Sequence, residues 1–201
     1  MSGKFIAIEG TEGSGKTPQF ERLILALPEH VRVATLDFPQ YQEPSSYLLQ
    51  KYLTGKYGGD VQPHAASILF AADRFDAKLK IREWLDEGRL VIANRYVASN
   101  MAYHGTKFPE RGTREHFYQW LYQLEYTIFG IPKPDISIVL HGLPRAAKGT
   151  AGAPAPDAYA EIAAIFPGDF QVIECAPGGM QLSPDAIHRE VLAVVRSVTG
   201  I

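Results

Sequence analysis

The chain alternates short apolar runs with longer stretches in which apolar residues recur every three or four positions. Five apolar runs bounded by turn-forming residues fall at 4–9, 31–36, 89–94, 135–140 and 171–175. Each has the length of a strand, and the absence of strict alternation is typical of strands that are covered on both faces. The pattern therefore predicts five strands that are mostly buried.

Helical spacing occupies the segments between these runs. A stripe of this kind predicts a helix that packs one face on the core. One stripe follows the first run and another precedes the third: Phe20, Leu23, Ile24 and Leu27, then Ile68, Leu69, Ala72, Phe75, Leu79 and Leu85. The second helix is predicted to begin near Pro63, where a missing amide hydrogen is tolerated, and to stop before Gly88, which suits a left-handed cap.

Two further helices complete the pattern. One is predicted over 114–129, with Gly130 just beyond it and a core face formed by Phe117, Leu121, Leu124 and Ile128. Ser183-Pro184 opens the other. Strands that alternate with helices imply parallel strands joined by crossover helices. We therefore expect a single domain over 1–201 with an α/β fold, in which a five-stranded parallel sheet carries helices on both faces.

Composition and charge exclude several classes of protein. The 201 residues are 46% apolar and 21% charged with a net charge of -2, which leaves no basic footprint for nucleic acid. No apolar stretch approaches the roughly 20 residues that cross a bilayer, and the first run is too short for a signal peptide. We expect a cytoplasmic protein without a membrane or nucleic-acid partner. The single cysteine, Cys175, lies in an apolar stretch that suits a buried thiol.

A phosphate-binding loop is the strongest chemical signal in the chain. Residues 10–17, GTEGSGKT, match the pattern G-x-x-x-x-G-K-[ST] in full, after a predicted strand and before a predicted helix. Glycines here let backbone amides turn around a phosphate, and the helix N-terminus adds its positive end. Lys16 is expected to bridge the β- and γ-phosphates of ATP, and Thr17 to offer its hydroxyl to Mg²⁺. The predicted ATP-binding residues are Gly10, Gly13, Ser14, Gly15, Lys16 and Thr17.

Further segments resemble one family of P-loop kinases, the thymidylate kinases. They are IEGTEGSGKT at 8–17, LFAADR at 69–74 and NRYVASNMAYHG at 94–105, with support from DFPQY at 37–41 and IPKPD at 131–135. The similarity is good over 4–140 and thin beyond. It implies a P-loop fold of the nucleoside-monophosphate-kinase type and a homodimer. The implied reaction transfers the γ-phosphoryl group of ATP to dTMP with Mg²⁺, which forms dTDP for dTTP synthesis.

The same resemblance assigns residues to the base of dTMP. It implies that Phe70 stacks under the thymine ring and that Arg74 donates to the base, and their i, i+4 spacing puts both on one helix face. The alternative is that Phe70 belongs to the core and that Arg74 pairs with a surface acid, since Asp73 and Asp76 are nearby. Three residues of DFPQY complete this side of the expected site, namely Phe38, Pro39 and Tyr41.

The phosphate and sugar of dTMP receive their own candidates. Arg95 resembles the arginine that holds the acceptor phosphate, a role that suits a fork of donors at the carboxyl end of a strand. Asn100 resembles the residue that hydrogen-bonds the pyrimidine edge, and Tyr103 the ring that crowds the 2′ position of the sugar. Glu12 matches a carboxylate near the 3′-hydroxyl and the metal, unless it is only a solvated loop acid. Lys16, Arg95 and Glu12 are therefore candidates for catalysis, and Thr17 and Glu12 for the metal.

Three features depart from the family pattern. Asn94 stands where the family usually has aspartate, and His141 replaces an aspartate after the fourth strand, where we expect a structural role. The segment 142–156, rich in Gly, Ala and Pro, predicts a short mobile lid in which only Arg145 and Lys148 are basic. Arg145 is the candidate for the lid's catalytic cation because its planar fork can hold two phosphate oxygens. The alternative is that Arg145 solvates a connecting loop.

Other functions fit parts of the pattern. A deoxynucleoside kinase shares the P-loop sheet, but Arg74 and Arg95 suit a monophosphate acceptor better than an uncharged nucleoside. Other nucleoside monophosphate kinases would use the same loop. A nucleotide-binding protein without catalysis would account for Asn94 and the sparse lid, whereas the intact Lys16-Thr17 pair indicates that ATP and Mg²⁺ are bound for chemistry.

Overall fold

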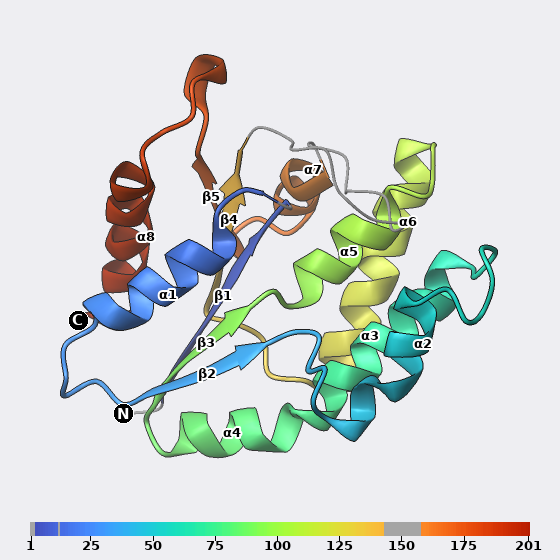
Figure 1. Ribbon diagram of the computed structural model, residues 1–201, viewed down its shortest axis with the longest axis horizontal. Helices are drawn as coiled ribbons and strands as arrows, with labels where there is room; N and C mark the ends of the chain where they lie inside the picture. Colours follow the sequence, from blue (N-terminus) through green and yellow to red (C-terminus); the bar gives the residue numbers. More distant parts are fainter. Residues whose placement is uncertain (1–2, 12, 143–157) are drawn as a thin grey trace.

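The fold is built around one parallel sheet. The computed structural model describes residues 3–11, 13–142 and 158–201. Its strands are β1 (Lys4–Gly10), β2 (Val33–Asp37), β3 (Leu90–Asn94), β4 (Ile136–His141) and β5 (Phe170–Glu174). They pair in the order β2-β3-β1-β4-β5, and every pair is parallel, so the predicted sheet is confirmed. All five carboxyl ends therefore meet at one edge of the sheet (Figure 1).

Burial separates the central strands from the edge strands. β1, β3 and β4 are buried along most of their length, as the apolar runs predict. β2 alternates between buried and exposed positions, and β5 is mostly exposed. The prediction of burial on both faces was therefore wrong for these two strands, because strands at the edges of a sheet are less completely covered by the helical layers.

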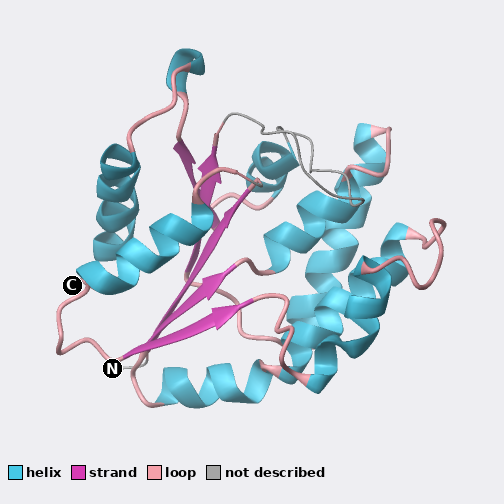
Figure 2. Ribbon diagram, viewed as in Figure 1, coloured by secondary structure: helices cyan, strands magenta, loops and turns pink. Residues whose placement is uncertain are grey.

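Helices fill the connections and lie on both sides of the sheet (Figure 2). The described ranges contain α1 (Lys16–Ala26), α2 (Tyr47–Leu53), α3 (Pro63–Asp76), α4 (Lys78–Asp86), α5 (Val97–Gly105), α6 (Arg111–Tyr122), α7 (Ala158–Ile165) and α8 (Pro184–Thr199), with short turns η1 (Pro44–Ser46), η2 (Gln123–Ile128) and η3 (Pro177–Gly179). α8 begins as predicted, and the Ser183 hydroxyl accepts a hydrogen bond from the Ala186 amide at 3.2 Å. Within the described part of the chain, no helix has both the length and the apolar character that a membrane span requires.

The sheet divides the hydrophobic core in two. Successive side chains of β1 point to opposite faces. Ile6 and Ile8 pack with α1 and α8 on one face, and Phe5 and Ala7 pack with α5, α6 and α7 on the other. The predicted helices on both faces are thus confirmed, and β1 is held from both sides directly below the loop that follows it.

The helix predicted from Pro63 to Gly88 is two helices. α3 begins at Pro63 and α4 ends just before Gly88, whose φ of 74° is left-handed as expected. Between them Ala77 has ψ -9, which breaks the helical course, so the two axes diverge in Figure 1. The predicted ends were right, and the predicted continuity was wrong.

The apolar stripe of this segment does not face the core. Ile68, Phe75 and Leu79 are 41%, 50% and 73% exposed. The side of α3 that is buried carries small or polar residues, namely Ala66, Ser67, Ala71, Asp73 and Arg74. Periodicity showed which side of the helix is apolar, but the polar side faces the rest of the fold. The apolar side is left on the surface.

The helix predicted over 114–129 starts earlier and changes type. α6 begins at Arg111 and continues into η2, a π-helix in which the Phe129 amide bonds to the Leu124 carbonyl at 2.8 Å. A π-helical turn holds more residues than an α-helical turn, so the buried face moves along the sequence. Ile128 is therefore 73% exposed and Glu125 is fully buried, which reverses the prediction.

Candidate functional site

The loop between β1 and α1 has the geometry of a phosphate cradle. Gly10 and Gly15 have φ of 140° and 89°, which side chains with a Cβ rarely adopt. A Cβ on Gly10 would also lie 2.4 Å from the Leu140 carbonyl oxygen, so this position requires glycine. The amides at the start of α1 have no partner within the helix and point toward the loop. These features suit a bound phosphate group.

Lys16 and Thr17 stand at the start of α1. The Lys16 side chain is buried and its Nζ donates to the Thr11 carbonyl at 2.5 Å, which keeps the ammonium folded along the loop. Thr17 is exposed at the same end of the helix. Glu12, the third polar residue predicted here, lies outside the described residues.

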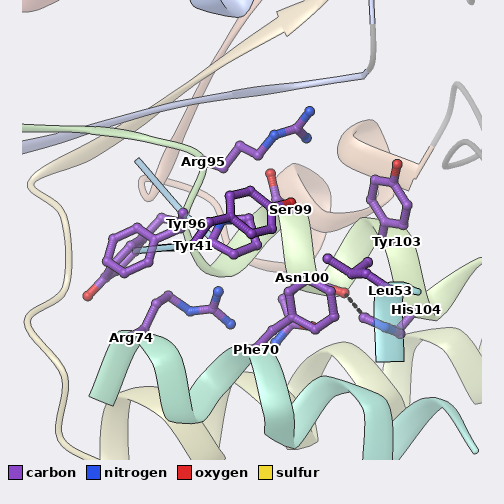
Figure 3. A pocket seen from close by; sticks show the side chains of 12 residues that line it. Tyr41, Leu53, Phe70, Arg74, Arg95, Tyr96, Ser99, Asn100, Tyr103 and His104 are labelled. Carbon is purple, nitrogen blue, oxygen red and sulfur yellow. Dashed lines mark hydrogen bonds between the residues drawn. The ribbon is translucent and has the colours of Figure 1, made fainter. Parts of the chain in front are cut away.

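A pocket opens beside this loop at the carboxyl edge of the sheet (Figure 3). All the dTMP-site residues predicted from the sequence line it, apart from Glu12: Phe38, Pro39, Tyr41, Phe70, Arg74, Arg95, Asn100 and Tyr103. They come from the ends of β2 and β3 and from α3 and α5. The structure thus brings together residues that are far apart in the sequence, and their roles in binding stay predictions.

Four lining residues were missed: Leu53, Tyr96, Ser99 and His104. Three of them lie within the segment 94–105 that carries the resemblance, and Ser99 and His104 are neighbours of Asn100 and Tyr103 along α5. Helical spacing could therefore have identified Ser99 and His104. Leu53, at the end of α2, carried no comparable signal.

Arg95 is held in an unusual backbone conformation. Its φ is 65°, the left-handed region that residues other than glycine seldom occupy. The Arg95 amide donates to the Ile8 carbonyl at 2.9 Å, and the next amide, of Tyr96, donates to the Glu9 carboxylate at 3.0 Å. These two bonds fix the turn after β3. In Figure 3 the Arg95 side chain lies on the opposite side of the Tyr41 and Tyr96 rings from Arg74.

Glu9 links the phosphate loop to the pocket. Its carboxylate is fully buried and accepts from the Ser99 hydroxyl as well as from Tyr96. Burial raises the pKa of Glu9, while the Ser99 hydrogen bond and the charge of Arg95 oppose that rise. Ser99 is in turn 3.2 Å from the Tyr159 hydroxyl, which donates to the Gly10 carbonyl at 3.0 Å. Glu9 thus supports the end of β1, as a strand-end residue should.

Arg74 is paired with a buried acid rather than a surface one. Its Nε and Nη2 donate to the two carboxylate oxygens of Glu125 at 2.5 and 2.6 Å, and both side chains are nearly inaccessible. Asp73 instead accepts from Ser45 and from the Gln40 amide. The alternative in which Arg74 pairs with a surface acid is therefore wrong. Phe70 lies in the pocket wall 5.1 Å from the His104 ring.

His104 is uncharged near neutral pH. Burial lowers its pKa to about 4, and the charges of Lys107 and Arg74 act in the same direction. Its Nδ1 lies 3.1 Å from the Asn100 carbonyl oxygen, which accepts a hydrogen bond from the neutral ring. The pocket wall behind Phe70 is therefore apolar in character.

Asn94 and His141, which stand where the family usually has aspartate, each have a specific partner. Asn94 lies opposite Asp37 across β2 and β3, and its side chain hydrogen-bonds the Asp37 carboxylate. Burial raises the pKa of Asp37, and Asn94 and Arg95 oppose that rise. His141 Nδ1 lies 2.8 Å from Glu174 Oε2 across β4 and β5 and lowers the pKa of that carboxyl. Next to Asn94 the sheet edge therefore still has a carboxylate, but this carboxylate is that of Asp37 on β2 instead of an aspartate on β3.

The sequence of the chain is similar to those of known proteins. The family model described as thymidylate kinase matches residues 8–151, which is most of the chain. The chain belongs to the thymidylate kinase family. A probable thymidylate kinase of Pyrobaculum aerophilum is 36% identical over 137 residues, covering 68% of this chain and 63% of that protein. The thymidylate kinase of Homo sapiens is 33% identical over 140 residues, covering 69% and 60%. The chain thus matches less than two thirds of the length of these relatives.

Solved structures agree on the fold. A thymidylate kinase from Candida albicans superposes with a TM-score of 0.73 at 22% identity, covering 98% of this chain and 92% of that one. A thymidylate kinase from Ehrlichia chaffeensis gives 0.68 at 20% identity, covering 97% and 100%. The predicted P-loop fold of the nucleoside-monophosphate-kinase type is therefore confirmed across nearly the whole chain.

Proposed function

We propose that this chain phosphorylates dTMP to dTDP with ATP. The observation that carries the proposal is the position of Arg95, which stands between the phosphate loop after β1 and the pocket beyond β3. Adjacent parallel strands place both at one edge of the sheet. A phosphate held by Arg95 would thus face the γ-phosphate held by the loop.

The chemistry follows from positioning and charge. An oxygen of the dTMP phosphate is already anionic near pH 7, so it can attack the γ-phosphorus without a general base. A bond from that oxygen to phosphorus forms as the bond to the β,γ-bridging oxygen breaks, and ADP leaves. Lys16 and Arg95 hold the donor and acceptor phosphates in line and stabilise the charge that develops.

The donor side fits a magnesium nucleotide. The described residues contain no group of three or more His, Cys, Asp or Glu that could hold a metal by itself. Mg²⁺ is commonly held by one or two protein groups together with substrate phosphates, so the exposed Thr17 hydroxyl beside the loop suffices. Bound there, Mg²⁺ would neutralise charge on the β- and γ-oxygens. Glu12 as a second ligand and Arg145 as a lid cation remain predictions, and both lie outside the described residues.

The acceptor side fits a pyrimidine deoxynucleotide. Phe70 offers a ring face, Arg74 and Asn100 offer polar atoms at the base edge, and Tyr103 stands on the same helix as Asn100, one turn further on. Under this proposal Tyr103 excludes a 2′-hydroxyl, and Phe38, Pro39 and Tyr41 close the pocket from the β2 side.

A coupled assay of ADP release tests the proposal. ATP and Mg²⁺ are supplied with dTMP, dUMP, UMP, thymidine or no acceptor. Release that requires dTMP supports the proposal. Faster turnover of thymidine than of dTMP would indicate a deoxynucleoside kinase, and binding of ATP without release in any arm would indicate a nucleotide-binding protein.

We further propose a homodimer that forms through the apolar stripe on α3 and α4. Ile68, Phe75, Leu79 and, from η2, Ile128 are all more than two-fifths exposed, and Phe75 stacks edge-on with Phe129 at 5.3 Å. An exposed apolar patch of this kind is typical of an interface. Sedimentation of Phe75→Glu should show a monomer, whereas Leu25→Glu, at a still more exposed leucine of α1, should leave the dimer intact. A monomeric unaltered protein would contradict the proposal.

The location of the protein in the cytoplasm also stays a prediction.

A further inference from the structure

Glu125 is a fully buried carboxylate that no catalytic step requires. It lies in the π-helical turn η2, and it contacts two pocket residues that belong to two other helices. It accepts a pair of hydrogen bonds from Arg74 of α3 and one from Asn100 Nδ2 of α5 at 3.0 Å. A buried acid is costly unless it is fully paired, and here both of its oxygens are engaged.

The contacts of Asn100 fix the direction of its amide. Its Nδ2 carries two hydrogens, which go to the Ser67 carbonyl at 3.1 Å and to Glu125. Rotating the amide by half a turn would place its oxygen against those same two acceptors, which is repulsive. Asn100 Oδ1 is therefore the atom left over, and it is buried without a hydrogen-bond partner among the described residues. An unsatisfied buried acceptor beside a pocket is suited to a donor on a ligand.

Arg74 presents the opposite polarity. Its Nε and one Nη2 hydrogen are directed to Glu125, and a guanidinium has five donors in all. Figure 3 shows Arg74 and Asn100 on the same side of the pocket, next to Phe70. The wall therefore offers a donor and, beside it, an acceptor. An N–H that adjoins a carbonyl on a flat ring complements this arrangement.

We infer that Glu125 is a positioning residue that fixes the donor of Arg74 and the acceptor of Asn100, and thereby selects the base. The inference rests on the proposed function. Thymine and uracil have an N3–H beside a 4-carbonyl and match the wall. Cytosine has an N3 acceptor beside a 4-amino donor and meets it with both polarities reversed, which leaves buried groups unpaired.

Glu125→Gln is the variant that tests this role. Glutamine keeps the size of the side chain but replaces one acceptor oxygen with an NH₂ group. It cannot accept from Arg74 twice and from Asn100 at the same time. Whichever way the glutamine amide turns, its NH₂ group meets a donor: at the Oε2 position it faces Arg74 Nε, and at the Oε1 position it faces Arg74 Nη2 and Asn100 Nδ2. The substitution therefore displaces at least the Arg74 donor from its place beside the base. We expect the preference for dTMP over dCMP in kcat/KM to fall by at least about tenfold, mainly through a higher KM for dTMP.

A matched control separates base selection from structural support. Glu161 also accepts two hydrogen bonds from one arginine, Arg114, at 2.9 and 2.6 Å, but it lies on α7 and lines no part of the pocket. Glu161→Gln should leave the dTMP to dCMP ratio unchanged. In both variants the ratio of kcat/KM for dTMP to that for dUMP should also stay unchanged, because thymine and uracil share the same polar edge.

The measurement pairs steady-state kinetics with equilibrium binding of dTMP and dCMP by calorimetry, and thermal melting monitors folding. An unchanged dTMP to dCMP ratio in Glu125→Gln, or an unaltered protein that binds both equally, overturns the inference. If the unaltered protein binds dTMP selectively but does not phosphorylate it, the proposed function fails while the binding ratios still decide the role of Glu125.

A second pair of variants keeps the test decisive if Glu125→Gln does not fold. Glu125→Asp retains a carboxylate and should keep the preference for dTMP at weaker affinity. Asn100→Ala removes the acceptor without touching the Arg74–Glu125 pair and should lose that preference. A loss in Glu125→Asp equal to that in Asn100→Ala, or no loss in Asn100→Ala, contradicts the inference.

Discussion

The phosphate loop and the acceptor pocket lie side by side at the same edge of the sheet, yet they are built in different ways. The loop consists of consecutive residues whose backbone amides are proposed to bind phosphate, and its shape is set by glycines with positive φ such as Gly10 and Gly15. The pocket is assembled from side chains that follow β2 and β3 and from side chains of α2, α3 and α5, with support from η2 behind them. The phosphate loop should therefore tolerate substitutions elsewhere in the chain, whereas the shape of the pocket depends on each helix and strand that contributes to it.

Loss of the loop's charge should have the largest effect. Lys16→Ala removes a cation expected to follow the transferring phosphoryl group, so turnover should fall by roughly 10³-fold or more. Thermal melting checks that the variant still folds, because the Lys16 side chain is buried in the loop. Lys4→Ala is the control, since Lys4 pairs with Asp135 at the opposite end of β1. Retention of more than about a tenth of the turnover would remove Lys16 from the proposed mechanism.

Arg95 lies between the two regions, and its removal should affect only the acceptor. Arg95→Ala is expected to raise the KM for dTMP and to lower kcat, together by about 10²-fold, because a charge-assisted contact to the phosphate is lost. The KM for ATP should barely change. An equal rise in both KM values would show that Arg95 serves the loop rather than the pocket.

The backbone of Arg95 allows a finer comparison. Ala and Gly at this position both lack the side chain, but only glycine adopts a φ of 65° without strain. Arg95→Gly should therefore have the same kinetics as Arg95→Ala and melt about 2–4 °C higher, as expected for roughly 1 kcal/mol in a chain of this size. Equal melting temperatures would indicate that the turn relaxes when the side chain is removed.

The loop was predictable because its signal is local. The motif at 10–17 stands between a strand and a helix, and the structure has both. The residues predicted for the dTMP site came from a resemblance, which supplies spatial neighbours that periodicity cannot, and they do line one pocket. Glu125 was missed because its burial depends on a π-helical turn, and the pattern of Leu124 and Ile128 assumed an α-helix. The stripe on α3 was read correctly as apolar but placed on the wrong side, since sequence periodicity does not reveal which neighbour covers a helix.

Acid should lower the free energy of unfolding through His104 in the pocket wall. The pKa of His104 is about 4 in the folded protein, against 6.5 for an ordinary histidine. Between these pH values the unfolded chain binds a proton that the folded protein does not, so stability falls as pH drops from about 6.5 to about 4 and levels off below. The full loss is on the order of 3 kcal/mol.

His104→Gln isolates this contribution, because glutamine can donate to the Asn100 carbonyl and does not titrate. Urea unfolding at pH 7 and pH 4.5 should show a smaller drop in the free energy of unfolding for the variant than for the unaltered protein. Other titrating groups, including Glu9 and Asp37, whose pKa values burial raises, are common to both proteins and cancel in the difference. Equal drops would mean that His104 is protonated without cost in the fold.

The smallest effect concerns the sugar. The unaltered protein should use dTMP best, dUMP less well and UMP much less well. Losing the thymine methyl group costs roughly 1–3 kcal/mol of apolar contact, and a 2′-hydroxyl would meet the Tyr103 ring. Tyr103→Ala removes that ring from α5 but leaves Arg74, Asn100 and Glu125 in place. It should therefore improve use of UMP relative to dUMP by about tenfold, while the dTMP to dUMP ratio stays as it was. Equal use of UMP and dTMP by the unaltered protein would show that the pocket does not read the sugar at all. A change in the dTMP to dUMP ratio would place Tyr103 against the base instead.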